Sequence, residues 1–278
     1  MNGYDPLGLA CITVNEEVEM RAGCRDLVES VRRKDVWLFF AVSDTKARYA
    51  RSTLGPWWIT LGTLLGVVGL GLVWSAVMKL ELAQMLPNLA VGLVLWFMIA
   101  GIISESPQCY VNQGGIIRNY SLPLMIHNLR LMSKHVVNFF HNLSIVVVVF
   151  AIYHAPSFFD LGWGVLGFII ILFNLAWLSV LLSLMGARFR DLGPTVDALM
   201  PVMFFLTPIL YKKSDVIDTA VWFSYNPIAN LFSLVKDPML SLPHHPENYL
   251  AMFGLGIVGW CIALMVLSRT HKKVVFWI

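Results

Sequence analysis

The chain alternates between long apolar runs and shorter segments rich in polar and charged residues. Six runs are almost free of charge and approach the roughly 20 residues that a helix needs to cross a hydrocarbon core. They cover residues 57–78, 86–103, 136–153, 164–184, 194–211 and 249–267. The pattern predicts an all-α membrane protein with six transmembrane helices, of which the second and fifth are marginal in length.

The basic residues fall mainly on one side of these predicted spans. Sixteen of the 20 Lys and Arg residues precede the first span, lie in the second-to-third or fourth-to-fifth connection, or follow the sixth span. Cytoplasmic segments of membrane proteins carry such an excess of basic residues. We therefore expect both termini to be cytoplasmic, which agrees with an even number of spans.

Four segments outside the spans have patterns of their own. Residues 1–25 are expected to form a cytoplasmic tail, whereas residues 26–53 mix apolar positions with a basic cluster. The second pattern is typical of an amphipathic helix that lies on the inner membrane surface. Residues 104–135 form a long cytoplasmic connection, and residues 212–248 form a long outer loop. Residues 26–278 are accordingly expected to form one six-span domain.

The outer loop contains a helix signal. Asn226 followed by Pro227 is typical of a helix start, with a capping side chain and then proline in the first turn. Apolar residues then recur at i, i+3, i+4 and i+7: Ile228, Leu231, Phe232 and Val235. An outer helix with an apolar face predicts short re-entrant helices between the fifth and sixth spans, dipping into the membrane or packing on it.

The composition excludes several classes of function. Of the 278 residues 58% are apolar and 13% charged, whereas soluble domains usually carry about 25% charged residues. No GxxxxGK[ST] loop occurs, so the chain lacks that device for binding ATP. Among ionisable groups the spans hold only Asp197 and His141, which disfavours a proton relay. Energy for uphill transport would have to come from a partner.

The chain also lacks a pattern for catalysis or metal binding. Its four cysteines are scattered without CxxC spacing. His127, His135 and His141 are eight and six residues apart, which does not place two imidazoles on one helix face. No Ser-His-Asp or paired-carboxylate arrangement can be argued. We expect no catalytic residues, no metal and no cofactor bound by this chain.

Four stretches, in order along the chain, resemble the type-two ABC exporter permeases of O-antigen, capsular polysaccharide and teichoic acid. Residues 47–58 match the RY..S.LG..W pattern of that family. Residues 187–192 match at the end of the fourth span, and residues 204–211 match at the end of the fifth. Residues 225–227 and 236–238 resemble the outer-loop NP…RDP pattern, with Lys where Arg is commoner.

The resemblance runs from about residue 25 to the C-terminus. It implies the transmembrane subunit of an inner-membrane exporter, working as a homodimer docked on a separate ATPase subunit. ATP and Mg²⁺ would bind to that partner. The implied cargo is a polysaccharide linked to polyprenyl diphosphate, which would pass between the two permeases from the cytoplasmic leaflet to the outside.

Two groups of residues are candidates for substrate binding. Arg48 and Arg51 stand where a lipid-linked diphosphate would approach, and the planar guanidinium pairs well with phosphate oxygens. The alternative is an ordinary basic anchor on anionic lipid. Phe204, Phe205 and Tyr211 offer flat surfaces along which a sugar chain could slide; the alternative is simple packing. Other aromatic residues, Trp57 and Trp58, fit better the belt at a membrane boundary.

Two further groups are candidates for coupling and gating. The resemblance places a short helix for contact with the ATPase between residues 114 and 134. Arg118, Asn119, Tyr120 and Pro123 are expected there in a small exposed loop; the alternative is an unspecialised connection. Outer helices beginning after Ser214 and at Asn226-Pro227 would close the channel when it is idle.

Other functions remain as alternatives. The chain could export a different cargo, such as teichoic acid, a lipid, haem or a drug. It could also be a membrane scaffold for glycan assembly that transports nothing and needs no ATPase. A membrane enzyme ranks third, for want of a catalytic arrangement.

Overall fold

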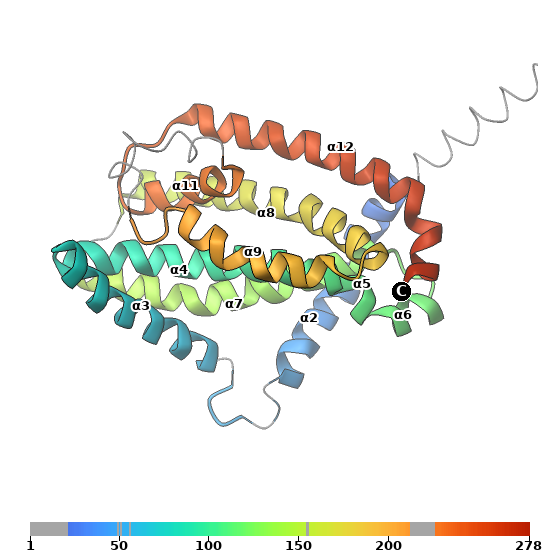
Figure 1. Ribbon diagram of the computed structural model, residues 1–278, viewed down its shortest axis with the longest axis horizontal. Coiled ribbons are helices and arrows are strands. Elements are labelled where there is room, and N and C mark those ends of the chain that lie inside the picture. Colours follow the sequence, from blue (N-terminus) through green and yellow to red (C-terminus); the bar gives the residue numbers. More distant parts are fainter. Residues whose placement is uncertain (1–21, 49, 51, 56, 154–155, 212–225) are drawn as a thin grey trace, which may run out of the picture.

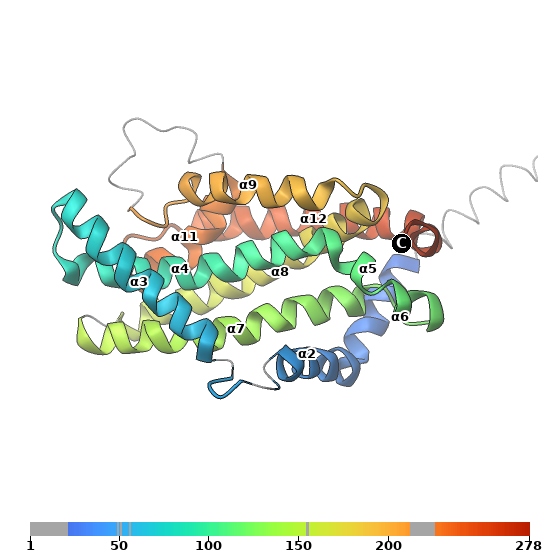
Figure 2. The same cartoon turned by 60° about the horizontal axis from the view of Figure 1, so that its bottom comes forward.

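In the computed structural model the chain is a bundle of long helices with short helical segments at its ends (Figures 1 and 2). The structure describes residues 22–48, 50, 52–55, 57–153, 156–211 and 226–278, and within these ranges no strand occurs. The prediction of an all-α architecture is confirmed for this part of the chain.

Among the described residues, five helical stretches are long and apolar enough to cross a membrane, which supports a multi-pass membrane protein. They are α3 (Trp57–Met78), α4 (Leu82–Glu105) with the short turns that continue it to Asn119, α7 (Met125–Ile152), α8 (Phe158–Arg188) and α12 (Pro246–Trp277). Each coincides with or covers nearly all of one predicted span. Four of them extend well beyond the predicted limits.

The predicted fifth span differs from the other five. Helix α9 (Leu192–Leu206) has 15 residues, so at 1.5 Å per residue it covers about 22 Å, less than the roughly 30 Å of a hydrocarbon core. Thr207 is extended because it precedes Pro208, which disfavours helical backbone. Residues 207–210 then form a buried turn. The count of six spans therefore stays a prediction.

Helix α7 begins earlier than the predicted third span. It starts at Met125, so the last part of the predicted connection 104–135 is helix. The connection itself holds three short helices: η1 (Ser106–Gln108), α5 (Cys109–Asn112) and α6 (Gly114–Asn119).

Helix α4 forms the centre of the bundle, and most of its residues from Met85 to Ile103 are buried. Helix α8 packs against α12 and against α11 (Pro227–Met239), the helix that follows Asn226. Small residues allow close contacts between helices. A methyl group on Gly167 of α8 would lie 2.3 Å from the carbonyl oxygen of Leu234 in α11, so no larger residue fits there.

The segment expected to lie on the inner membrane surface is helical. One helix covers residues 22–32, and α2 (Lys34–Arg48) follows it and packs against α7. Apolar side chains of both helices are exposed: Val28, Val31, Leu38, Phe39 and Val42. An exposed apolar face is what a helix lying on a membrane needs.

Candidate functional site

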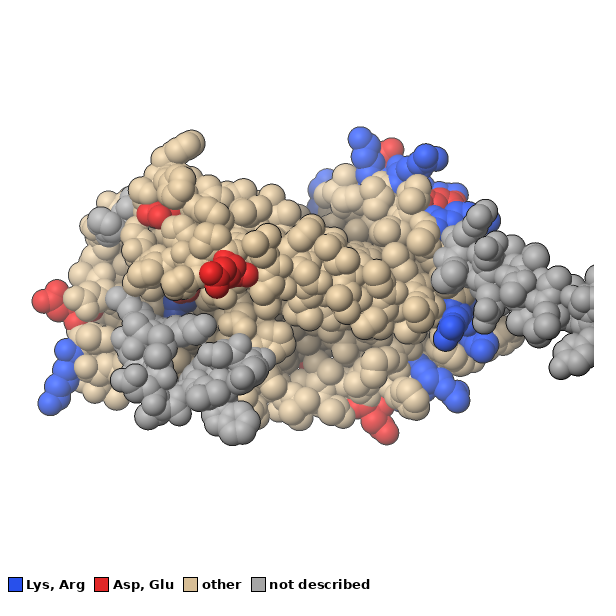
Figure 3. Space-filling view, turned by 90° about the horizontal axis from the view of Figure 1, so that it is seen from above, with Lys and Arg blue, Asp and Glu red and all other residues tan. Residues whose placement is uncertain are grey.

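One end of the bundle gathers the basic side chains. Figure 3 shows Lys and Arg clustered over this end, whereas the long middle part of the same face is mostly uncharged. Arg118 lies in the last turn of α6, Arg188 ends α8, and Lys272 and Lys273 lie near the end of α12. Below, this region is called the basic end.

The four residues predicted for coupling lie at the basic end, with different exposure. Arg118 and Asn119 are exposed at the end of α6, where the Asn119 amide donates to the Gly115 carbonyl at 2.8 Å. Tyr120 is 66% exposed. Pro123 is buried, so its expected place in an exposed loop is wrong. The chain at this point turns inward to begin α7.

The start of α7 is held by the helix over residues 22–32. Both carboxylate oxygens of Asp26 accept backbone N–H groups, from Leu124 at 2.8 Å and Met125 at 3.0 Å. These two amides lie at the start of α7, where the backbone N–H groups have no hydrogen-bond acceptor within the helix itself. Burial raises the pKa of the Asp26 carboxyl, and the two amide hydrogen bonds oppose this shift.

The same N-terminal helix also contacts α12. The Gly23 N–H donates to the hydroxyl of Ser268 at 3.0 Å. A methyl group on Gly23 would lie 2.7 Å from the carbonyl oxygen of Leu264. The helix therefore joins the start of α7 to the end of α12.

Arg130 of α7 joins two other elements of the basic end. Its guanidinium donates to both carboxylate oxygens of Asp44 in α2, each at 2.6 Å. A third N–H donates to Gln113, between α5 and α6, at 2.8 Å. The guanidinium also lies 4.8 Å from the ring centre of Phe40. Arg130 thus connects α2 to the segment between α4 and α7 that carries Arg118.

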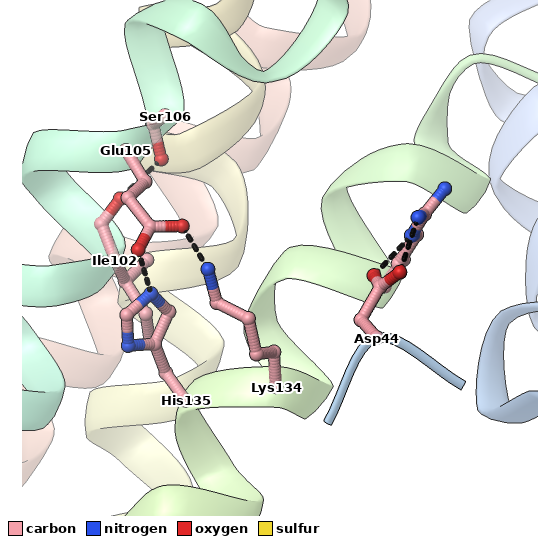
Figure 4. Close-up of polar contacts among 7 residues, drawn as sticks. Asp44, Ile102, Glu105, Ser106, Lys134 and His135 are labelled. Atoms are coloured by element: carbon pink, nitrogen blue, oxygen red, sulfur yellow. Dashed lines mark hydrogen bonds and ion pairs between the residues drawn. The ribbon is translucent and has the colours of Figure 1, made fainter. Parts of the chain in front are cut away.

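Glu105 makes a second ionic contact nearby, at the end of α4. Figure 4 shows the side chains of Lys134 and His135, both on α7, pointing toward the Glu105 carboxylate. Lys134 forms an ion pair with it, and His135 Nε2 lies 3.4 Å from Oε1. These contacts fix the C-terminal end of α4 against α7.

A buried hydrogen-bond network fixes the short helices to α7 and α8. The Tyr110 hydroxyl donates to Asn128 Oδ1 at 2.6 Å. The Asn128 amide donates to the hydroxyls of Ser179 and Ser183, both at 2.9 Å. The Ser183 hydroxyl lies 2.8 Å from the carbonyl oxygen of Ser106, to which it donates. This network could not be predicted from the sequence, because isolated polar residues in apolar helices give no sign of which residues pair.

The residues predicted for substrate binding are not brought together. Arg48 ends α2 near the basic end, but its side chain and Arg51 lie outside the described residues. Phe204 and Phe205 lie in the last turn of α9, at the opposite end of the bundle. The ring of Phe204 packs edge-on against Trp96 at 5.7 Å, whereas Phe205 is 64% exposed.

Tyr211 belongs with the two phenylalanines. Its hydroxyl donates to the carbonyl oxygen of Phe205 at 3.0 Å, and the side chain is partly buried. The three aromatic residues therefore form one cluster at the end of α9, with Phe205 its most exposed member.

Asn226 and Pro227 begin α11 as predicted. Asn226 Oδ1 accepts the N–H groups of Ile228 at 3.0 Å and Ala229 at 3.3 Å. Its amide donates to the Leu206 carbonyl, at the end of α9, at 3.2 Å. Of the apolar stripe, Phe232 and Val235 are buried and Ile228 and Leu231 partly buried. The helix expected after Ser214 lies outside the described residues.

A buried lysine holds the turn between α9 and the outer loop. Lys236 of α11 is 2% exposed, and its ammonium donates to the carbonyl oxygens of Pro208, Ile209 at 3.2 Å and Tyr211 at 3.0 Å. Asn88 of α4 donates to Ile209 as well, at 3.3 Å. The turn is thus fixed from two helices. From the sequence, Lys236 stands out only as the first residue of the 236–238 stretch, where the related permeases more commonly have Arg.

Comparisons with known proteins find relatives over most of the chain. The chain is 23% identical over 244 residues to the O-antigen export system permease protein RfbA of Klebsiella pneumoniae, covering 86% of this chain and 93% of the relative. A second protein of that name and organism is 24% identical over 82% of this chain and 90% of its own length. One from Myxococcus xanthus is 26% identical over 76% of each chain.

The matching family model spans most of the bundle. The model of the ABC-2 type transporter matches residues 38–240, from α2 to the end of α11. This range includes the short helices of the basic end, α9 and the turn held by Lys236. The chain therefore belongs to the ABC-2 type transporter family and is a type-two ABC permease.

Proposed function

We propose that this protein is the transmembrane subunit of an exporter that moves a polysaccharide linked to polyprenyl diphosphate, such as O-antigen, across the inner membrane. The observation that carries the proposal is the match to three O-antigen export permeases, two of them over 90% or more of their length. Membership of the ABC-2 type transporter family supports a transport subunit rather than an enzyme.

The basic end is the cytoplasmic end in this proposal. Cytoplasmic segments favour Lys and Arg, and the basic side chains gather at this end (Figure 3). Both the helix over residues 22–32 and the end of α12 lie there, so both termini are cytoplasmic. Helix α9, together with the turn that follows it, is then the sixth segment to cross the membrane. An even number of crossings places both termini on the same side.

The short helices of the basic end contact the partner ATPase. Arg118, Asn119 and Tyr120 are exposed there, and Tyr110 and Arg130 connect these helices to α7 and the surface helix α2. A rigid connection is what a coupling element needs, since motion of the ATPase must move whole helices. ATP and Mg²⁺ bind to the partner, and this chain binds no cofactor.

Two copies of the chain enclose the path of the polymer. Arg48 and Arg51 attract the diphosphate near the inner headgroups. At the outer end Phe205 offers an exposed ring to the sugar chain. Helix α11, beginning at Asn226 and Pro227, packs against α8 and forms part of the outer gate.

Deletion of the gene in its own organism tests the proposal. Lipid-linked polymer should accumulate on the cytoplasmic side, with synthesis intact and surface glycan lost. The tagged protein should also co-purify with an ATPase. Normal surface glycan would contradict glycan export and favour another cargo. Loss of the polymer altogether, with no ATPase recovered, would point to an assembly scaffold instead.

A further inference from the structure

An apolar cavity of about 340 Å³ lies between α4, α7, α8 and α11. Protein sites for organic molecules usually have volumes of about 300–1,000 Å³, so the cavity is large enough for part of a lipid. Three of its lining side chains are exposed: Phe140 of α7, and Leu161 and Val165 of α8. The cavity therefore opens between α7 and α8, onto the apolar surface of the bundle.

The lining of this cavity determines what can occupy it. It consists of Val, Leu, Phe and Met side chains and one glycine, Gly164. Among the described residues no hydroxyl, amide or charged side chain lines it. A polar occupant would lose its hydrogen bonds to water without replacement, at a cost of several kcal/mol. The occupant must therefore be a hydrocarbon chain.

The cavity lies in the half of the membrane that is remote from the basic end. Helix α8 starts at Phe158 and runs toward the basic end. Its lining residues lie between Leu161 and Phe168, at depths of about 5–15 Å below that start. Because a hydrocarbon core is about 30 Å thick, these residues span one leaflet. An acyl chain of a phospholipid in that leaflet reaches the cavity directly.

Asp160 lies at the rim of this cavity. It precedes the lining residue Gly164 by four positions, which places both on one face of α8. The hydroxyl of Ser241, two residues after the lining residue Met239, donates to Asp160 Oδ2 at 3.1 Å. The partly exposed carboxylate therefore stands where α8 and the end of α11 meet above the cavity.

The Asp160 carboxylate has an unfilled position for a cation. Its Oδ2 also accepts the Ser157 hydroxyl at 2.7 Å, whereas Oδ1 has no hydrogen-bond donor among the described residues. None of the ion pairs formed by these residues includes Asp160. The sequence has no Lys or Arg in residues 135–187 or 237–268, so the surrounding elements offer no permanent positive charge. His244 interacts electrostatically with the carboxylate, but it is a cation only when protonated.

We propose that this cavity holds one acyl chain of a phospholipid whose headgroup carries an ammonium, as in phosphatidylethanolamine. The chain lies between α7 and α8 against the apolar lining, and the ammonium pairs with Asp160 at the rim. Charge selects this lipid over an anionic one, because a phosphoglycerol headgroup brings only negative charge to the carboxylate. The site does not depend on the export of a glycan.

Two positions of α8 provide a matched pair of variants for the chain. Val165 lines the opening of the cavity, and Ile169, one turn further along the same face, does not. Their exposed fractions are similar, 53% and 57%. Val165→Trp covers the opening, whereas Ile169→Trp adds the same side chain to the same apolar surface and leaves the opening free.

A second matched pair tests the headgroup. Asp160→Asn removes the charge and keeps an oxygen that can accept the hydroxyls of Ser157 and Ser241. Glu247→Gln is the control, since Glu247 is an exposed acidic residue in the first turn of α12. Both changes remove one negative charge.

The full-length protein is tested in phosphatidylglycerol vesicles that contain a trace of one lipid with a diazirine in its chain. The three probes are phosphatidylethanolamine, phosphatidylglycerol and polyprenyl diphosphate. We expect phosphatidylethanolamine to label residues 139–146 of α7 and 161–168 of α8 more strongly than the other two probes. Asp160→Asn should weaken this labelling about twofold to fivefold, as the loss of an exposed ion pair does. Glu247→Gln should leave it unchanged.

The tryptophan variants test the cavity itself. Labelling by phosphatidylethanolamine should fall at least fivefold in Val165→Trp, because the chain can no longer enter, and stay unchanged in Ile169→Trp. Equal labelling in these two variants would overturn the proposal. Should Val165→Trp fail to fold, Asp160→Asn and Glu247→Gln still decide.

The comparison of probes can also overturn the proposal. Equal labelling by phosphatidylethanolamine and phosphatidylglycerol, or labelling that is unchanged in Asp160→Asn, would show that Asp160 selects no headgroup. Labelling by the polyprenyl probe alone would assign the cavity to that lipid instead. None of these results affects the proposed export function, which is tested by the location of the glycan.

Discussion

Arg130 and Asp44 form a two-point ion pair although they are 86 positions apart in the sequence. Nε to Oδ2 and Nη2 to Oδ1 both measure 2.6 Å, and the side chains are 15% and 34% exposed. Two parallel hydrogen bonds between a planar guanidinium and a carboxylate strengthen the ion pair and also fix the relative orientation of the two groups. The pair fixes the surface helix α2 against α7, beside the short helices that carry Arg118.

Replacing Arg130 with lysine tests this geometry, because the charge is kept and the two parallel bonds are lost. We expect Arg130→Lys to lower the free energy of unfolding by about 1–2 kcal/mol. The matched control is Arg33→Lys, since Arg33 pairs with Glu29 on the exposed surface; such pairs contribute less than about 1 kcal/mol. Thermal unfolding of the purified protein measures both. Equal losses would contradict a structural role for the pair.

Helix α8 offers a test of the close contact with the short helices. A methyl group on Gly186 would lie 2.1 Å from the carbonyl oxygen of Pro107, so Gly186→Ala must push η1 away from α8. We expect a loss of several kcal/mol, or failure to fold, as overpacking costs about 1–3 kcal/mol even where side chains can adjust.

The control for that change is Gly162→Ala in the same helix. Gly162 has open space around it, and alanine is favoured over glycine in helices by about 1 kcal/mol. Gly162→Ala should therefore leave the melting temperature unchanged or raise it. A melting temperature of Gly186→Ala close to that of the wild type would show that η1 is not held against α8.

Features that depend on residues close together in the sequence could be predicted from it. Asn226 and Pro227 lie within one turn of the start of α11, so their residue types alone predict that a helix begins there. The apolar stripe of α11 could be predicted for the same reason, because its residues lie within two turns of one helix. Apolar runs likewise located the long helices, because burial in a membrane requires an uninterrupted apolar surface.

Helix ends and contacts between residues far apart in the sequence could not be predicted. Helix α7 continues through Arg130 and Lys134, where the apolar run has ended, because both charges are paired by Asp44 and Glu105 from other elements. Nothing in the sequence links those partners. Lys236 gives the same lesson: a charged residue in an outer loop proved to be buried, since the turn after α9 supplies three carbonyl groups.

Lys236 is expected to hold the outer turn in place. Lys236→Met removes this donor from the carbonyl groups of Pro208, Ile209 and Tyr211, although Ile209 still accepts from Asn88. A buried carbonyl group that loses its donor costs about 1–3 kcal/mol. Lys236→Arg, which keeps a positive donor, should retain more stability than Lys236→Met. Lys79→Met, at an exposed lysine after α3, is the control. Similar melting temperatures for all three variants would rule out this role.

Asn128 is expected to connect the short helices to α8. Asn128→Leu removes the acceptor of the Tyr110 hydroxyl and the donor to Ser179 and Ser183. We expect the free energy of unfolding to fall by about 2–3 kcal/mol. Asn112→Leu, at an exposed position of α5, serves as the control. If the two variants unfold alike, the network does not stabilise the basic end.

Phe204 and Phe205 are adjacent in sequence but should differ in role. Phe204 packs against Trp96, so Phe204→Ala should destabilise the protein by about 1–3 kcal/mol. Phe205 is 64% exposed, so Phe205→Ala should leave stability unchanged and slow the export of long polymers. Protein level and polymer length distribution at the cell surface distinguish these outcomes. Unchanged export in Phe205→Ala would remove this ring from the substrate path.

ATP-driven transport by purified components is the decisive test of the proposed export function. Proteoliposomes would contain this permease, the ATPase that co-purifies with it and a radiolabelled polysaccharide linked to polyprenyl diphosphate. We expect ATP to drive the polymer to the opposite face, where an added glycosidase can cleave it, and we expect no transport when either subunit is omitted. Polymer that stays protected while ATP is hydrolysed would contradict the proposed function.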